Sequence, residues 1–217
     1  MPFSIKTKQV AAVTLIVGLA VILVSLWYAS SLVNVWLGEA KARAELIADM
    51  VSHRITGVGN EASAQTDQTS EPLEVRVERS LAADPGLHDI VEGSLFSDNV
   101  IYAAIVDTEG KVIVHSTPGL NGSYMRDPVE NIETLLAEGP IAQARAIYTR
   151  YGKSYEYRST PLLLGKPPRE FATVRVGIST LFLRSELEQQ MRTPLITSVV
   201  AMGIALFVAV LLAQLTL

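Results

Sequence analysis

Histidine is the residue type here best suited to acid–base or metal chemistry, and the chain contains three, His53, His88 and His115. They fall in separate segments, without the close spacing of ligands that a zinc site requires. The sequence also lacks the G-x-S-x-G, Walker, G-x-G-x-x-G and H-E-x-x-H motifs of common catalytic and nucleotide-binding sites. We therefore predict no catalytic residues, no metal and no cofactor in this chain, which is not expected to be an enzyme by itself.

Length, charge and cysteine content further restrict the classes of protein to which this chain could belong. The 217 residues suffice for one ordinary domain with accessory segments. A net charge of −4 gives no electrostatic basis for binding nucleic acid. The absence of cysteine excludes a disulfide framework and a thiolate zinc site. Hydrophobic residues make up 49% of the chain, and their excess lies at the two ends.

The N-terminal apolar segment predicts a membrane helix. From Val10 to Gly38 there is no charged residue, and about 20 apolar residues span a bilayer. A cleaved signal peptide has a shorter apolar region, roughly 7–15 residues, so a retained transmembrane helix over residues 10–31 is favoured. Two lysines precede it, and this charge bias places residues 1–9 in the cytoplasm.

Beyond the membrane the same helix is expected to continue. Apolar residues recur at steps of three and four from Leu32 to Arg54, and Glu39–Met50 contains good helix formers without Pro or Gly. This stripe either covers the domain's own sheet or pairs with the same helix of a second copy, as a spacing near 3.5 permits. Both interpretations stay open, and a homodimer is expected.

The remaining water-facing segment predicts an α+β domain. A loop or a frayed helix end is expected over Gly57–Pro72, followed by two short helices, Leu73–Ala83 and Leu87–Phe96. Asp127 and Pro128 predict a capped helix over Pro128–Glu138. The later segments that read as strands are Ala144–Arg150 and Ser154–Leu164, forming a hairpin, and Phe171–Ser179. In total about five antiparallel strands are expected, with helices on one face.

The stretch Ile101–Ser116 (IYAAIVDTEGKVIVHS) predicts the β-hairpin around which this domain is organised. Two runs rich in β-branched and aromatic residues flank Thr108-Glu109-Gly110, and Gly110 can take a positive φ. The hairpin resembles the first hairpin of the extracytoplasmic PAS-like (PDC or Cache) sensor domains of bacterial transmembrane receptors. The run FATVRVGIS, Phe171–Ser179, is similar to the closing strand of such domains. The resemblance implies a PAS-like sheet whose ligand lies against one face, below the loop after the first hairpin.

The resemblance also implies seven candidate ligand-binding residues on the hairpin, the following loop and the later strands. They are His115, Tyr124, Arg126, Tyr148, Arg150, Tyr157 and Arg175. Strand alternation would place Tyr148 and Arg150 on one face, and cations suit an anionic ligand such as a carboxylate. The dicarboxylate- and citrate-sensing branch has Arg and His at positions that hold Val114, Thr117 and Tyr157 here. The identity of the ligand therefore stays open.

The C-terminal segment predicts a second membrane helix. A helix over Leu181–Arg192 is followed by residues 193–217, which contain no charge and can span a bilayer. The chain ends inside this run, so a longer receptor, or a chain without an output domain, is expected.

These features together predict the signal-input region of a bacterial inner-membrane receptor, above all a two-component sensor histidine kinase. Residues 32–192 would form its periplasmic PAS-like domain. The alternatives are an input module of a chemoreceptor or diguanylate cyclase, or a membrane-anchored periplasmic assembly or structural protein. The expected partners are the lipid bilayer, a second copy and a small molecule.

Overall fold

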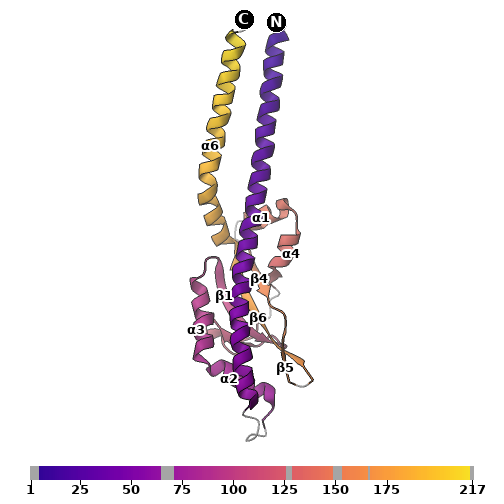
Figure 1. Cartoon of the computed structure of the whole chain (residues 1–217), viewed down its shortest axis with the longest axis vertical. Coiled ribbons are helices and arrows are strands. Elements are labelled where there is room, and N and C mark those ends of the chain that lie inside the picture. Colours follow the sequence, from indigo (N-terminus) through magenta and orange to yellow (C-terminus); the bar gives the residue numbers. More distant parts are fainter. Residues whose placement is uncertain (1–4, 65–70, 126–128, 149–152, 166, 216–217) are drawn as a thin grey trace.

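Two long helices extend from one end of an α+β domain (Figure 1). The computed structural model describes residues 5–64, 71–125, 129–148, 153–165 and 167–215. Helix α1 (Ile5–Ala64) comprises 60 residues, and α6 (Thr180–Leu215) comprises 36. The two helices lie side by side, with both chain termini at their far end (Figure 1). The predicted long N-terminal helix is therefore confirmed.

Within the described residues, one helical segment is long and apolar enough to cross a membrane, Gly18–Ser63 of α1. Only 6% of its most apolar window is buried in the protein, unlike the core helix of a soluble domain. This segment has the length and composition of a membrane anchor or a signal sequence.

The part of α1 that packs against the α+β domain is longer than expected. It continues past Arg54 to Ala64, because Val58 and Ala62 pack into the core one turn apart. Of the two alternatives for Gly57–Pro72, the helix end holds for the residues up to Ala64 and the loop does not, and residues 65–70 lie outside the described residues.

The two short helices that follow cover the same core. Helix α2 (Leu73–Ala83) has the predicted bounds. Helix α3 (Pro85–Gly93) begins two residues before the predicted start, because Asp84 caps it by accepting a 2.7 Å hydrogen bond from the Leu87 amide. A 3₁₀ turn, η2 (Ser94–Phe96), completes this segment.

The sheet is six-stranded and mixed, which corrects the expected five-stranded antiparallel sheet. Its strand order is β2-β1-β6-β4-β3, with β5 paired to β6, and β3 runs parallel to β4. The strands are β1 (Val100–Asp107), β2 (Val112–His115), β3 (Glu130–Asn131), β4 (Ser154–Arg158), β5 (Leu162–Leu164) and β6 (Arg169–Ser179). The predicted first hairpin is confirmed as β1 and β2, and Gly110 in its turn has a φ of 88°.

The segment between β2 and β4 differs most from the prediction. After a 3₁₀ turn, η3 (Pro118–Leu120), and β3, the helix α4 (Ile132–Ala137) is capped by Asn131. The expected cap Asp127 and start Pro128 lie outside the described residues. The predicted strand Ala144–Arg150 is wrong, because α5 (Pro140–Ile147) occupies its first part. Pro140 stands at the first helical turn, where a missing N–H costs nothing.

The main core lies between α1 and the sheet face nearest to it. Alternate residues of β1 and β6, such as Ile105, Val174 and Val176, point toward α1 and are fully buried. The opposite face, which we call the second face, has a smaller apolar cluster of Ala104, Val106 and Val112. Tyr102 and Met125 pack against this cluster. The polar residues of β1, β4 and β6 that alternate with the core residues therefore project from the second face.

Candidate functional site

Strand register brings polar residues together on the second face in two adjacent rows. In one row His115 of β2 pairs with Ala104 of β1, Ala104 with Arg175 of β6, and Arg175 with Arg158 of β4. Directly paired residues project to the same face of a sheet. In the next row Tyr102 and Glu156 both pair with Gly177. We call Tyr102, His115, Glu156, Arg158 and Arg175 the polar cluster.

Gly177 allows side chains of β1 and β4, the two strands that flank β6, to reach each other across β6. A Cβ at position 177 would lie 2.2 Å from Cε1 of Tyr102, so the tyrosine ring occupies the space above β6. Its hydroxyl donates a 2.5 Å hydrogen bond to Oε1 of Glu156 on β4. The pKa of Tyr102 is raised mainly by burial and, to a smaller extent, by the hydrogen bond to Glu156. The phenol is therefore a neutral donor that spans the central strand.

Glu156 is a fully buried carboxylate with two donors. Its exposed fraction is 0%, and beside Tyr102 it accepts a 2.9 Å hydrogen bond from Nε of Arg158. Nη2 of Arg158 also donates to the Val129 carbonyl at 3.1 Å. Because a buried carboxylate is costly without partners, this network fixes the relative positions of β1, β4 and the chain just before β3.

Arg175 introduces a positive charge next to this pair. Its Nε is buried and has no hydrogen-bond partner among the described residues. The cluster contains two guanidinium groups, those of Arg158 and Arg175, and one carboxylate, that of Glu156. Because Glu156 is bonded to Arg158, the positive charge of Arg175 is not balanced within the cluster. A guanidinium with an unused donor suits a carboxylate or another small anion.

His115 lines the cluster as an uncharged ring. Its side chain is buried and stacks on Tyr102, with ring centroids 5.5 Å apart and an interplanar angle of 21°. Nδ1 accepts a 2.8 Å hydrogen bond from the Thr117 amide, so the neutral ring carries its proton on Nε2. Burial lowers the pKa of His115, which favours this neutral form.

The structure brings together two of the seven predicted ligand-binding residues, His115 and Arg175. Tyr157 lies on the other face, toward α1, because it alternates with Glu156 along β4. Tyr124 is 51% exposed, and its backbone forms an isolated antiparallel β-bridge with Lys111 beside the hairpin. Tyr148 ends α5, where the Arg184 guanidinium lies 5.4 Å from its ring centroid. The expected alternation with Arg150 on a strand is therefore wrong.

Arg126 and Arg150 lie outside the described residues. Three members of the polar cluster, Tyr102, Glu156 and Arg158, were not among the predicted ligand-binding residues. The alternation of Glu156 with Tyr155 and Tyr157 in the sequence could have indicated that one carboxylate faces away from the core. The reach of Tyr102 over Gly177 depends on strand register, which the sequence alone does not show.

Comparisons with protein-family models, with curated proteins and with solved structures each return no match for this chain. The functional argument therefore depends on the geometry of the chain's own residues.

Proposed function

We propose that this chain is the signal-input region of a bacterial membrane receptor, such as a two-component sensor histidine kinase. In this proposal α1 and α6 both cross the inner membrane, and the α+β domain is a periplasmic PAS-like (Cache) sensor. Support comes from the two long helices leaving the same end of the domain, since both can then enter one bilayer (Figure 1). The lysines at the N-terminus favour a cytoplasmic start for α1.

The polar cluster is the proposed ligand site, and a small carboxylate or similar anion is the proposed ligand class. Arg175 would supply the cation, with Arg158 as a neighbouring donor, because its bonds to Glu156 and Val129 leave further N–H groups of its guanidinium unused. The observation that carries this proposal is the position of Arg175 on β6, the strand that runs directly into α6 at Ser179 and Thr180. A ligand that moves β6 therefore acts on the exit helix without an intervening loop.

The proposed mechanism is a shift between two packings of the sheet against the long helices. A ligand that binds one packing more tightly increases its population, and a helix can transmit such a change as a displacement or rotation. Inserting Gly-Pro after Arg184 should break α6 and abolish the response of a full-length receptor. A receptor that still responds with this insertion would disprove transmission through α6.

The binding test uses the full chain in lipid nanodiscs and calorimetric titration with acetate, malonate, succinate and citrate. At least one of these anions should bind saturably, and Arg175→Ala should weaken it roughly tenfold or more, as expected for a lost hydrogen bond to a charged group. Arg169→Ala is the matched control, because Arg169 is an exposed arginine on the same strand. Absence of binding by all four anions, or equal binding by Arg175→Ala, would refute the assignment.

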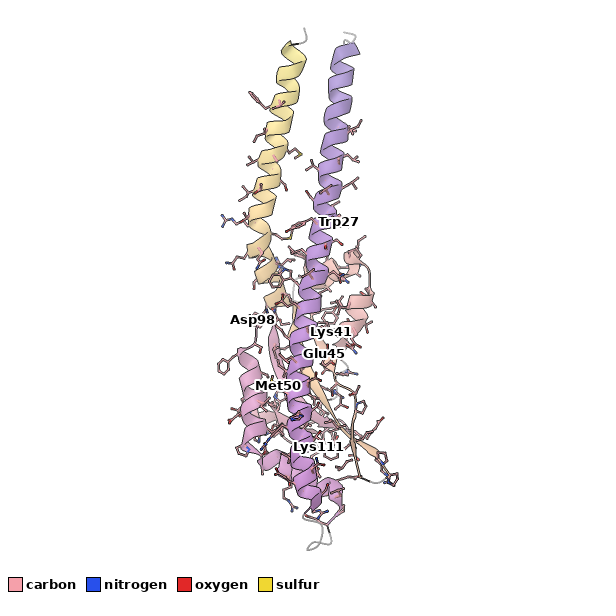
Figure 2. All side chains as sticks on the ribbon, viewed as in Figure 1. Trp27, Lys41, Glu45, Met50, Asp98 and Lys111 are labelled. Atoms are coloured by element: carbon pink, nitrogen blue, oxygen red, sulfur yellow. The ribbon has the colours of Figure 1, made fainter. Side chains whose placement is uncertain are left out.

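The same proposal includes a homodimer that pairs through α1. The outward side of its water-facing part exposes Val35, Leu46 and Met50, with exposed fractions of 60%, 61% and 46%. At 100° per residue these three side chains share one side of the helix, opposite the buried stripe that includes Ala44 and Val51. Figure 2 shows Met50 on α1 and the long span of this helix beside the domain.

The absence of native cysteine makes disulfide cross-linking a clean test of this dimer. Leu46→Cys should form a disulfide dimer in membranes under mild oxidation. Glu45→Cys is the matched control, since it is exposed on the same turn but points about 100° away. Equal cross-linking at both positions, or none at Leu46→Cys, would contradict pairing along this stripe.

A further inference from the structure

A cavity of about 570 Å³ lies between α4, α5 and the edge of the sheet at β3 and β4. Its lining residues include Glu130, Leu135, Glu138, Arg145, Lys153 and Tyr155. Tyr155 precedes Glu156 on β4, and consecutive strand residues point to opposite faces. The cavity is therefore separated by the sheet from the polar cluster on the second face.

The floor of this cavity is apolar and its rim is charged with both signs. Leu135, Ala146 and Tyr155 are buried, with exposed fractions of 2%, 6% and 3%. The charged side chains at the rim are exposed, two acidic and two basic: Glu130, Glu138, Arg145 and Lys153. The volume lies within the range of small-molecule sites in proteins, roughly 300–1,000 Å³.

The polar atoms at the rim are arranged around Glu130. The ammonium of Lys153 lies 3.5 Å from Oε2 of Glu130. The Tyr155 hydroxyl also interacts with Glu130, and burial together with this carboxylate raises the pKa of Tyr155 to about 12. The phenol is therefore protonated at neutral pH and is a hydrogen-bond donor at the junction of floor and rim.

We propose that this cavity binds a small zwitterion, a molecule that carries an ammonium group and a carboxylate or phosphate. The ammonium would lie against Glu130 and Glu138, and the anionic group against Lys153 and Arg145. The rim has two acidic and two basic side chains, so a ligand with a single charge would add a net charge above an apolar floor, whereas a zwitterion leaves the site neutral. This site does not depend on the receptor role proposed above.

The main chain of Lys153 connects this cavity to the exit helix. The Lys153 amide donates to Oγ1 of Thr180 at 2.7 Å, and that hydroxyl donates back to the Lys153 carbonyl at 2.8 Å. The Thr180 amide donates to the same carbonyl at 3.0 Å. Thr180 is fully buried and is the first residue of α6. An occupant held by Lys153 therefore stabilises the base of α6, which makes the cavity a regulatory site for that helix.

The binding experiment uses calorimetric titration of the full chain in nanodiscs with glycine, 4-aminobutyrate and phosphoethanolamine, which vary the separation of the two charges and the kind of anionic group. Acetate and ethylamine are the half-molecule controls, and all these titrations are repeated in an Arg175→Ala background so that binding at the polar cluster does not contribute. At least one zwitterion should bind saturably, and Glu130→Gln and Lys153→Met should each weaken it roughly tenfold or more. Lys153→Met retains the main-chain bonds to Thr180, and Glu170→Gln, an exposed glutamate on β6, is the matched control.

Three results would overturn the site. They are no binding of any zwitterion at about 10 mM, which is ten times a weak Kd of ~1 mM; unchanged binding in both variants; or equally tight binding of a half-molecule. Glu130→Gln and Lys153→Met leave Arg175 intact, so failure here is distinguishable from failure of the carboxylate site on the second face.

Hydrogen–deuterium exchange of the full chain tests the connection to α6. The binding zwitterion should slow exchange of the Lys153 and Thr180 amides, because both donate in the bonds just described. Thr180→Val, which removes the hydroxyl but keeps the shape, should reduce this effect while the zwitterion still binds. Slowed exchange confined to α4 and α5 would show that the cavity does not act on α6.

Discussion

Replacing Gly177 by alanine tests whether strand register builds the polar cluster. The new Cβ would lie 2.2 Å from Cε1 and 2.5 Å from Cδ1 of Tyr102, far inside van der Waals contact. The contacted atoms belong to a ring rather than to the end of a flexible chain, so the ring as a whole has to move. Its hydroxyl would then lose the 2.5 Å hydrogen bond to Glu156.

The expected cost has two parts. Overpacking of a well-packed site costs about 1–3 kcal/mol. Loss of one donor to the fully buried Glu156 carboxylate costs about 1.5–3 kcal/mol, because Arg158 is then left as its side-chain donor among the described residues. Since the two effects share one displacement, Gly177→Ala should lower the free energy of unfolding by about 2–5 kcal/mol.

The assay is urea unfolding of the full chain in mild detergent, with pulse proteolysis reporting the folded fraction of the α+β domain. In a Tyr102→Val background the ring is absent, so Gly177→Ala should cost less than about 1 kcal/mol. Gly93→Ala is the control, because its Cβ would meet nothing within 4 Å. A cost of Gly177→Ala that is the same with and without the Tyr102 ring would refute the reasoning.

Three further predictions concern stability. Asp84→Ala should lower the free energy of unfolding by about 1–3 kcal/mol, because Asp84 caps α3 and accepts two hydrogen bonds, of 2.9 and 2.5 Å, from Arg54 of α1. His88→Ala is the control in the same urea assay, and a cost of Asp84→Ala below about 0.5 kcal/mol would contradict the prediction. Burial lowers the pKa of His115, so this imidazole binds a proton more readily in the unfolded chain than in the folded chain. The free energy of unfolding should therefore fall as the pH drops below about 6.5, and a His115→Gln variant should lose this part of the pH dependence. Gly110→Ala should cost about 1 kcal/mol, measured by the same assay, because a φ of 88° is unfavourable for any residue with a Cβ; no loss would show that the turn can adopt another conformation.

Elements with strong local signals could be predicted from the sequence. The hairpin of β1 and β2 combines two β-branched runs with a glycine in its turn, and β6 is a continuous alternating run between turn residues and a helix. Helix α2 has its charges opposite Val77 and Leu81, which are both buried. In each case neighbouring residues determine the conformation, so no distant contact is needed to predict it.

Elements whose local signals conflict were predicted incorrectly. Residues 144–147 contain alanine and isoleucine, which fit a strand or a helix over so short a run. Tertiary packing favours α5, since it buries Gln143, Ala146 and Ile147 together. The parallel pairing of β3 with β4 is likewise non-local, because two residues carry too little pattern to specify a strand.

The sequence by itself determined the two apolar ends, the long N-terminal helix and the central hairpin, because hydrophobic runs and turn residues act over a few neighbours. Only the tertiary structure decided which side chains lie together: Tyr102, Glu156 and Arg175 come from three strands and share one face in this register, and the bond from Tyr102 to Glu156 also requires a glycine beneath the ring. Register is fixed by burial of the whole sheet face, since a slip of one residue would turn every side chain to the opposite face. The candidate site is therefore a consequence of packing rather than of any local motif.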